Sequence, residues 1–251
     1  MKYTDLFTDF DDTLYDTHGN AILALKELYD DFHLDQYFER IEDFTVPYWE
    51  ANVELWDQYA KGLIERDYLI VERFRRPLSK GYVGNGGEKI PFAPTREYCL
   101  EVSDHFLDLC ACKPGVVEGA HELVEALKTA GFRMHICSNG FHEVQYRKLR
   151  ASGLLDAFDT IILSEDAGAN KPSRQFFDYA FSQTGAVPER TLMIGDNFQT
   201  DILGAKAVGL DVMFFNRKPN TFVASETVTY EIHSLKEALL VLLGNYQSLF
   251  L

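Results

Sequence analysis

Acidic, hydroxyl-bearing and lysine side chains occur at four places along the chain, each at or just after a segment predicted to be a buried strand. In an open parallel sheet, ligands bind beyond the carboxyl ends of the strands, so residues at those ends are expected to meet at one edge. Several carboxylates beside a lysine could hold a cation and a phosphate group and so support phosphoryl transfer. The residues concerned are Asp9, Asp11, Ser138, Asn139, Lys171, Asp196 and Asp201.

The elements that must position these residues are predicted from apolar periodicity. Residues 5–10 are expected to form the first buried strand, and from about Val116 onward strands alternate with amphipathic helices. That alternation predicts an α/β fold with a doubly wound parallel sheet. The expected strands are residues 133–138, 159–164, 191–195 and 211–216, and the expected helices are residues 118–130, 143–152, 174–184 and 200–209.

Between the first strand and this repeat lies a segment of different texture, about the size of a small domain. Its large side chains recur at three- and four-residue spacing, which predicts helices; Trp49, Val53, Trp56 and Ala60 are one such series. Glycines at 81–87 and prolines at 91 and 94 predict a loop between two of the helices. The expected domains are a core, residues 1–15 and 113–251, and a mainly helical cap, residues 16–112.

Composition and charge restrict the location of the chain and the classes of partner. The 251 residues include 39 acidic and 24 basic side chains, for a formal net charge of −15. A nucleic-acid polymer is not an expected partner, because phosphate neutralisation needs clustered lysine and arginine. No stretch approaches the roughly 20 apolar residues of a membrane span, and the acidic start does not fit a signal peptide. We expect a cytoplasmic protein that does not bind membranes and forms a monomer or a small homo-oligomer.

The four cysteines, Cys99, Cys110, Cys112 and Cys137, are too scattered for a disulfide framework or a zinc site. They are expected to be buried thiols.

Taken in order, four segments resemble the four motifs of the haloacid dehalogenase superfamily, whose first motif is Asp-x-Asp-x-Thr-Leu. The segments are Asp9–Leu14, Cys137–Gly140, Lys171–Pro172 and Gly195–Asp201. The resemblance covers the core on both sides of the insert. It implies a Rossmann-like core with an inserted cap, and a magnesium-dependent phosphatase that works through an aspartyl-phosphate intermediate.

Within that resemblance, the first motif supplies the two groups that act on the ester. Asp9 would attack phosphorus, which splits hydrolysis into two easier steps. Asp11 would protonate the departing alcohol and then take a proton from the water that cleaves the intermediate.

The remaining motifs supply positive charge and hydrogen bonds. Mg²⁺ would be held by Asp9, the main-chain carbonyl of Asp11 and Asp196, with Asp201 steadying that shell. Lys171 would neutralise charge on the phosphate and on Asp9. The Ser138 hydroxyl and the backbone N–H of Asn139 would bind phosphate oxygens.

Parts of the chain are also similar to the pyrimidine nucleoside 5'-monophosphatases of this superfamily. The similarity implies a small phosphate ester as partner, with a pyrimidine nucleoside monophosphate as the expected substrate. For the arginines of the insert segment, Arg73, Arg75 and Arg76, a solvated helical face is the favoured interpretation and substrate contact is the alternative. The similar segments are residues 138–141, 143–145, 148–149, 164–168 and 71–76.

Other functions remain open at this point. A sugar-phosphate phosphatase or phosphomutase of the same superfamily would share both aspartates, although phosphomutases usually carry Gly-Val where this chain has Asp12-Thr13. Haloalkanoate dehalogenases lack the second aspartate, so Asp11 argues against them. The non-enzymatic alternatives are a phospho-accepting switch, a class about half this length, and a binding protein. The presence of all four motifs favours an enzyme.

Overall fold

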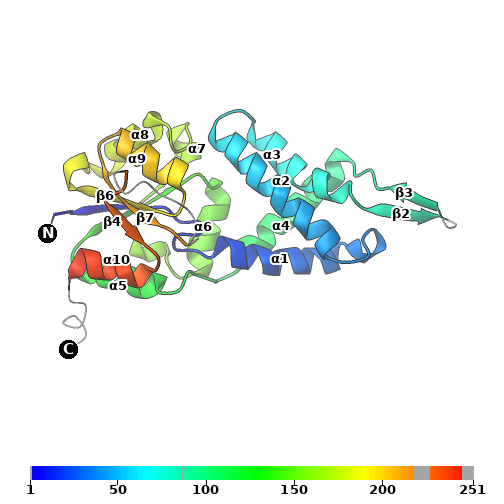
Figure 1. Cartoon of the computed structure of the whole chain (residues 1–251), viewed down its shortest axis with the longest axis horizontal. Coiled ribbons are helices and arrows are strands. Elements are labelled where there is room, and N and C mark those ends of the chain that lie inside the picture. The colour runs from blue at the N-terminus through cyan, green and yellow to red at the C-terminus, as the bar shows by residue number, and fades with distance from the viewer. Residues whose placement is uncertain (1, 86–87, 218–226, 245–251) are drawn as a thin grey trace. The chain divides into compact units, whose positions relative to one another are not determined.

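The computed structural model describes residues 2–85, 88–217 and 227–244, and the chain divides into two compact units (Figure 1). The first unit, called the core below, is formed by residues 1–17 and 114–251. The second unit, called the cap, is formed by residues 18–113. Each unit buries hydrophobic clusters of its own, as expected for structural domains.

The core is built on a six-stranded sheet in the order β5-β4-β1-β6-β7-β8. Strand β1 (Asp5–Thr8) lies in the middle of the sheet, between β4 and β6. Every neighbouring pair is parallel, so the carboxyl ends of all six strands lie at one edge. The predicted doubly wound parallel sheet is confirmed. The other strands are β4 (Arg133–Ser138), β5 (Thr160–Leu163), β6 (Thr191–Gly195), β7 (Asp211–Phe215) and β8 (Tyr230–Ile232).

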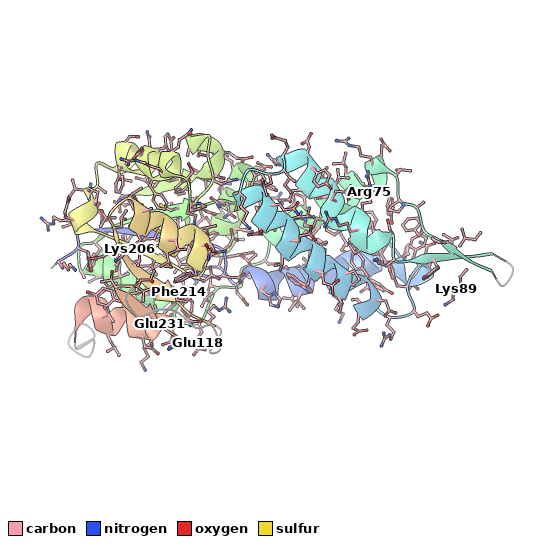
Figure 2. The ribbon with its side chains drawn as sticks, turned by 45° about the horizontal axis from the view of Figure 1, so that its top comes forward. Arg75, Lys89, Glu118, Lys206, Phe214 and Glu231 are labelled. Carbon is pink, nitrogen blue, oxygen red and sulfur yellow. The ribbon has the colours of Figure 1, made fainter. Side chains whose placement is uncertain are left out.

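Helices cover both faces of this sheet because alternate strand side chains point to opposite faces. Leu6 joins a cluster with α5 (Ala120–Thr129) and α10 (Leu235–Leu243). Phe7 joins a second cluster with α8 (Arg174–Thr184) and with Phe214 of β7, which is labelled in Figure 2. Leu6 and Phe7 are both fully buried, and each such burial contributes roughly 1.5–3 kcal/mol to folding. The central strand is therefore held from both sides.

Most predicted core elements have the expected type and nearly the expected bounds. The ranges of β4, β6 and α8 match the prediction, and α6 (His142–Ala151) begins and ends one residue earlier than predicted. Strand β1 ends at Thr8 instead of residue 10, although the Asp9 N–H still donates a hydrogen bond to the Ile194 carbonyl over 2.8 Å. The first motif therefore begins where the ladder ends.

Parts of the core differ from the prediction, which also did not include α10. The helix expected over residues 200–209 is a π-helical turn, Phe198–Leu203, followed by the short α9 (Gly204–Ala207). Such turns are frequent at functional sites, and this one carries Asp201. The short elements α7 (Ser164–Ala167) and β8 are absent from the prediction, because three or four residues are too few for a periodic signal.

The cap is mainly helical, as predicted. Its helices are α1 (Thr17–Asp31), α2 (Glu42–Ala60), α3 (Arg66–Leu78) and α4 (Arg96–Ala111). Rings from α2, α3 and α4 pack together in its interior with centroids 5.3 to 6.5 Å apart. These rings belong to Phe44, Tyr48, Phe74 and Phe106. The aromatic side chains of this region therefore build a hydrophobic core.

The buried face of α2 is not the series that predicted the helix. Val53 of that series is 68% exposed. The fully buried side chains form a neighbouring stripe with the same three- and four-residue spacing: Phe44, Tyr48, Ala51 and Leu55. Both stripes satisfy helical periodicity, and the aromatic cluster with α3 and α4 selects the second one.

The predicted loop between α3 and α4 is wrong as a description of residues 82–91. The antiparallel strands β2 (Tyr82–Asn85) and β3 (Glu88–Pro91) form a hairpin there. Tyr82, Val83 and Ile90 favour strands, and this preference exceeds the loop signal of the neighbouring glycines and prolines. Gly86 and Gly87 of the predicted loop lie outside the described residues.

The expected burial of the cysteines is confirmed for three of the four. Cys99, Cys110 and Cys137 are buried, whereas Cys112 is exposed just after the end of α4. Within the described part of the chain, every helix is too short or too polar to cross a bilayer.

Candidate active site

Four predicted site residues form a charged cluster at the carboxyl ends of β1 and β6. Asp9 follows β1, Asp196 follows β6, and Asp201 lies on the π-helical turn beyond it. Each of the three carboxylates has an oxygen within 4.8 Å of one from each of the other two. The Lys171 Nζ lies 2.8 Å from Asp9 Oδ1 and 2.7 Å from Asp201 Oδ1. The structure thus brings together side chains that are up to 192 positions apart, because their strands are neighbours.

Burial makes the charges of this cluster depend on one another. It raises the pKa of Asp9 to about 7, with the charges of Asp201 and Asp11 adding to the effect and the Lys171 ammonium opposing it. Burial and the nearby carboxylates of Asp9 and Asp201 likewise raise the pKa of Asp196. Burial alone would lower the pKa of Lys171, but the charges of Asp201 and Asp9 outweigh it and raise that pKa. Lys171 therefore stays charged, and the carboxylates repel one another.

The donor set fits a hard divalent cation. Three carboxylates around one ammonium leave an excess of buried negative charge, which is costly unless it is compensated. Carboxylate oxygens suit Mg²⁺, which usually binds one or two carboxylates and keeps several waters. The raised pKa values of Asp9 and Asp196 show the electrostatic cost that a bound cation would remove.

Local backbone bonds hold Asp196 and Asp201 in place after β6. The Asn197 side chain accepts hydrogen bonds from the backbone N–H groups of Gln199 and Thr200, over 3.0 and 3.1 Å, in an Asx-type turn. The Asn197 N–H in turn donates to Asp201 Oδ2 over 3.1 Å. Gly195 is required here, since a Cβ at that position would overlap the Asp201 carboxylate. This close packing turns the Asp201 side chain into the cluster.

Thr13, the threonine of the first motif, connects the two central strands. Its hydroxyl donates to Asp9 Oδ2 over 3.0 Å and accepts from the Asp196 N–H over 3.1 Å. Both oxygens of Asp9 are therefore engaged, one by Thr13 and the other by Lys171. Thr13 was part of the predicted motif but had no predicted role.

Asp11 is held by polar side chains that do not belong to the charged cluster. Its Oδ1 accepts from the Lys148 ammonium over 2.6 Å and from the Thr17 hydroxyl, and its Oδ2 accepts from Gln145 Nε2 over 2.6 Å. Burial raises the pKa of Asp11, but Lys148, Thr17 and Gln145 outweigh it, so the pKa lies below its ordinary value. The two aspartates of the first motif thus have opposite electrostatic surroundings.

The second motif lies between Asp11 and Lys171. The Ser138 hydroxyl oxygen accepts from the Gly140 N–H over 3.0 Å and from Gln145 Nε2 over 2.7 Å. The Asn139 side chain pairs with the backbone of Lys171: it donates to the carbonyl over 3.0 Å and accepts from the N–H over 2.8 Å. Asn139 therefore fixes the backbone of Lys171, a contact that its predicted backbone role did not include.

Sequence reasoning did not assign site roles to Gln145, Lys148 and Thr17. Gln145 and Lys148 are 0% and 8% exposed on α6, three residues apart on one face. Polar side chains rarely occupy the buried face of a helix. Gln145 and Lys148 share that face with Val144 and Leu149, and this placement could have indicated a role in the site. Finding that signal required knowing which face of α6 is buried.

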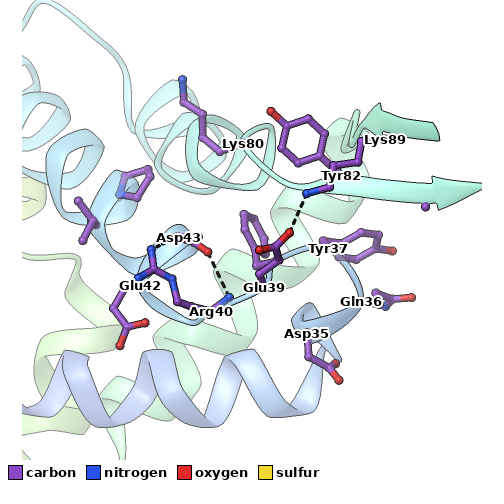
Figure 3. Close-up of a pocket in the computed structure, with 14 residues that line it drawn as sticks. Asp35, Gln36, Tyr37, Glu39, Arg40, Glu42, Asp43, Lys80, Tyr82 and Lys89 are labelled. Carbon is purple, nitrogen blue, oxygen red and sulfur yellow. Dashed lines mark hydrogen bonds and ion pairs between the residues drawn. The ribbon is translucent and has the colours of Figure 1, made fainter. Parts of the chain in front are cut away.

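A cavity of about 780 Å³ lies entirely within the cap (Figure 3). Its charged side chains are largely paired: Lys89 Nζ lies 2.7 Å from Glu39 Oε1, and Arg40 Nη2 lies 2.7 Å from Asp43 Oδ1. None of the predicted site residues lines it. The buried carboxylates and the lysine that could carry out the chemistry lie instead in the cluster around Asp9.

Comparison with known proteins identifies the family of the chain. The family model of the haloacid dehalogenase-like hydrolases matches residues 6–209. The hydrolase YfnB of Bacillus subtilis is 33% identical over 240 residues, which cover 94% of each chain. A crystal structure of YfnB bound to magnesium, in which interdomain movement is seen, matches with a TM-score of 0.82 and 30% identity over 96% of this chain and 99% of that one.

Two further relatives are nucleotidases. The pyrimidine 5'-nucleotidase YjjG of Escherichia coli is 29% identical over 247 residues, covering 95% of this chain and 99% of the relative. The pyrimidine 5'-nucleotidase PynA of Streptococcus pneumoniae is 27% identical over 240 residues, covering 95% and 94%. The chain belongs to the haloacid dehalogenase-like hydrolase family.

Proposed function

We propose that this chain, a phosphoric monoester hydrolase, hydrolyses pyrimidine nucleoside 5'-monophosphates with Mg²⁺ and an aspartyl-phosphate intermediate. The observation that carries the proposal is the Asp9 carboxylate, buried and bonded to Lys171 and Thr13 beside two further carboxylates. A nucleophile held at both oxygens is oriented before the substrate arrives, which lowers the entropic part of the barrier.

In the first step, an Asp9 oxygen forms a bond to phosphorus while the bond to the ester oxygen breaks. For this step Asp11 must first take up a proton, and the negative charge of a phosphate bound beside it would raise its pKa, which is low in the free protein. Asp11 then gives that proton to the ester oxygen, and the nucleoside leaves as the alcohol. In the second step, water attacks phosphorus and passes a proton to Asp11, which releases inorganic phosphate and restores Asp9.

The remaining residues would bind the phosphate and offset its charge. Lys171, the Ser138 hydroxyl and the Asn139 N–H are proposed to contact phosphate oxygens. Asp9, Asp196, Asp201 and the Asp11 carbonyl would hold Mg²⁺. When bound, Mg²⁺ supplies positive charge against the phosphoryl group that approaches these carboxylates.

The substrate class rests on similarity and on the cap, which we propose selects the leaving group. YjjG and PynA, both pyrimidine 5'-nucleotidases, are similar to this chain over nearly its whole length. In the cap, Arg75 and Arg76 form ion pairs with Glu72 and Glu54, which supports a packing role for both. Arg73 is buried, so its predicted solvated position is wrong, and it is our candidate for substrate contact.

The test is a panel of esters with the purified chain and Mg²⁺. Catalytic efficiency toward UMP, dUMP and dTMP should exceed that toward glucose 6-phosphate and glycerol phosphate by about tenfold or more, the preference that base stacking can supply. EDTA should abolish activity, and added Mg²⁺ should restore it. Equal efficiency across the panel would leave only the phosphatase, and full activity in EDTA would refute the cation.

A further inference from the structure

Gln145 contacts Asp11 of the first motif, the proposed acid and base, and Ser138 of the second motif, a proposed phosphate ligand. The side chain is fully buried on α6, and its Nε2 lies 2.6 Å from Asp11 Oδ2 and 2.7 Å from Ser138 Oγ. An amide nitrogen has two hydrogens, so these two bonds use both. The carboxylate of Asp11 also sets the amide orientation, because the reversed amide would place its oxygen against that carboxylate.

The bond to Ser138 determines what the serine hydroxyl can do. A hydroxyl has two acceptor sites and one hydrogen. The Ser138 oxygen already accepts from the Gly140 N–H and from Gln145. Its single hydrogen is therefore left to donate, as binding a phosphate oxygen requires.

The bond to Asp11 completes the support of that carboxylate. Lys148 lies one helical turn after Gln145 and donates to Asp11 Oδ1 over 2.6 Å, while Gln145 donates to Oδ2. Helix α6 thus presents one donor to each oxygen of Asp11.

Two observations indicate that the site is shaped around this amide. The Gln145 Oε1 is buried and has no hydrogen-bond partner, a penalty that an apolar side chain of the same size would avoid. A Cβ at position 140 would overlap the Gln145 side chain, so glycine there gives the amide its space.

We propose that Gln145 is a positioning residue, which aims the Asp11 carboxyl at the departing ester oxygen and the Ser138 hydrogen at the phosphate. The inference rests on the proposed function. Loss of Gln145 would weaken phosphate binding for every substrate, because Ser138 is then free to rotate. It would harm proton donation only for esters whose leaving oxygen needs a proton.

The experiment compares kcat/KM for a nucleoside monophosphate with kcat/KM for 4-nitrophenyl phosphate, whose leaving group departs without a proton. Both values report the chemistry up to formation of the phosphoenzyme. In Gln145→Met, kcat/KM for the nucleoside monophosphate should fall on the order of 10²-fold. For the aryl ester, kcat/KM should fall by about tenfold or less. Gln183→Met, an exposed glutamine on α8, is the matched control and should change neither.

A second variant, Gln145→Asn, keeps an uncharged amide but shortens the side chain by one methylene, which withdraws its hydrogens from Asp11 and Ser138. It tests the inference if the methionine variant fails to fold. An equal fall for both esters in the folded variant would overturn the positioning of Asp11, and unchanged values would overturn the whole inference. A wild-type protein inactive on both esters would instead overturn the proposed function, on which the inference rests.

Discussion

The core and the cap each bury a cationic side chain to almost the same depth, in very different surroundings. Lys171 of the core is 2% exposed and forms ion pairs with Asp9 and Asp201 over 2.8 and 2.7 Å. Arg73 of the cap is 3% exposed, and its guanidinium lies 5.4 and 5.3 Å from the ring centres of Phe74 and Phe106.

The guanidinium of Arg73 lacks the compensation that Lys171 has. Among the described residues, no carboxylate forms an ion pair with Arg73, and its Nε has no hydrogen-bond partner. Its Nη2 donates to Ser103 Oγ over 3.4 Å. Arg73 is held by the packing of its stem and by the faces of two rings.

Equal burial of Lys171 and Arg73 therefore does not imply an equal role. In the core, the cation and its carboxylates depend on one another, so removing one leaves the others buried and uncompensated. In the cap, the guanidinium of Arg73 has no ion pair among the described residues, so we expect its charge to contribute little to folding.

The largest expected effect is that of Lys171→Met. Activity should fall by on the order of 10³-fold or more, because one substitution removes the charge beside both the nucleophile and the phosphate. The free energy of unfolding should fall by about 3–5 kcal/mol in EDTA, because Asp9 and Asp201 are left without their cation. Urea unfolding followed by circular dichroism measures this.

Lys206→Met, at an exposed lysine on α9 (Figure 2), is the control and should match the wild type. Wild-type stability of Lys171→Met would contradict the compensation.

A much smaller effect on folding is expected for Arg73→Met. Loss of the two cation–π contacts should destabilise the variant, whereas removal of a buried charge that has no ion pair should stabilise it. Because these effects oppose each other, the free energy of unfolding should change by about 1 kcal/mol or less. The same urea titration measures this, and a KM for UMP raised about tenfold at that unchanged stability would identify a substrate contact. Arg75→Met, at the partly exposed arginine paired with Glu72 (Figure 2), is the matched control. A loss as large as that of Lys171→Met would remove the contrast between the two units.

The smallest effect concerns pH and the buried His135 of β4. Burial lowers the pKa of His135 below its ordinary value of 6.5, although Asp5 opposes this. The unfolded chain therefore takes up the proton first as pH falls, so the stability that neutral His135 contributes is present above about pH 6.5 and declines below it. Unfolding titrations at about pH 7.5 and 5.5 should show a smaller loss in His135→Gln than in the wild type. The exposed His121→Gln should follow the wild type, and an equal loss in all three proteins would refute the assignment.

The regular part of the fold was predictable because its signal is local. Apolar runs followed by amphipathic segments define β4, β6 and α8 without knowledge of any partner. The cap was less predictable: α2 carries two stripes with helical spacing, and only packing against α3 and α4 decides which is buried.

Short-range pattern and motif order were enough to predict the residue types of the site and the two strands, β1 and β6, that Asp9 and Asp196 directly follow. The side chains that hold the site residues in place could not be predicted in this way. Gln145 and Lys148 reach Asp11 from more than 130 positions away because α6 turns one face toward the sheet. Arg73 is buried because two rings of the cap enclose it. Such contacts depend on packing between distant segments, and local periodicity carries no information about a partner across that distance.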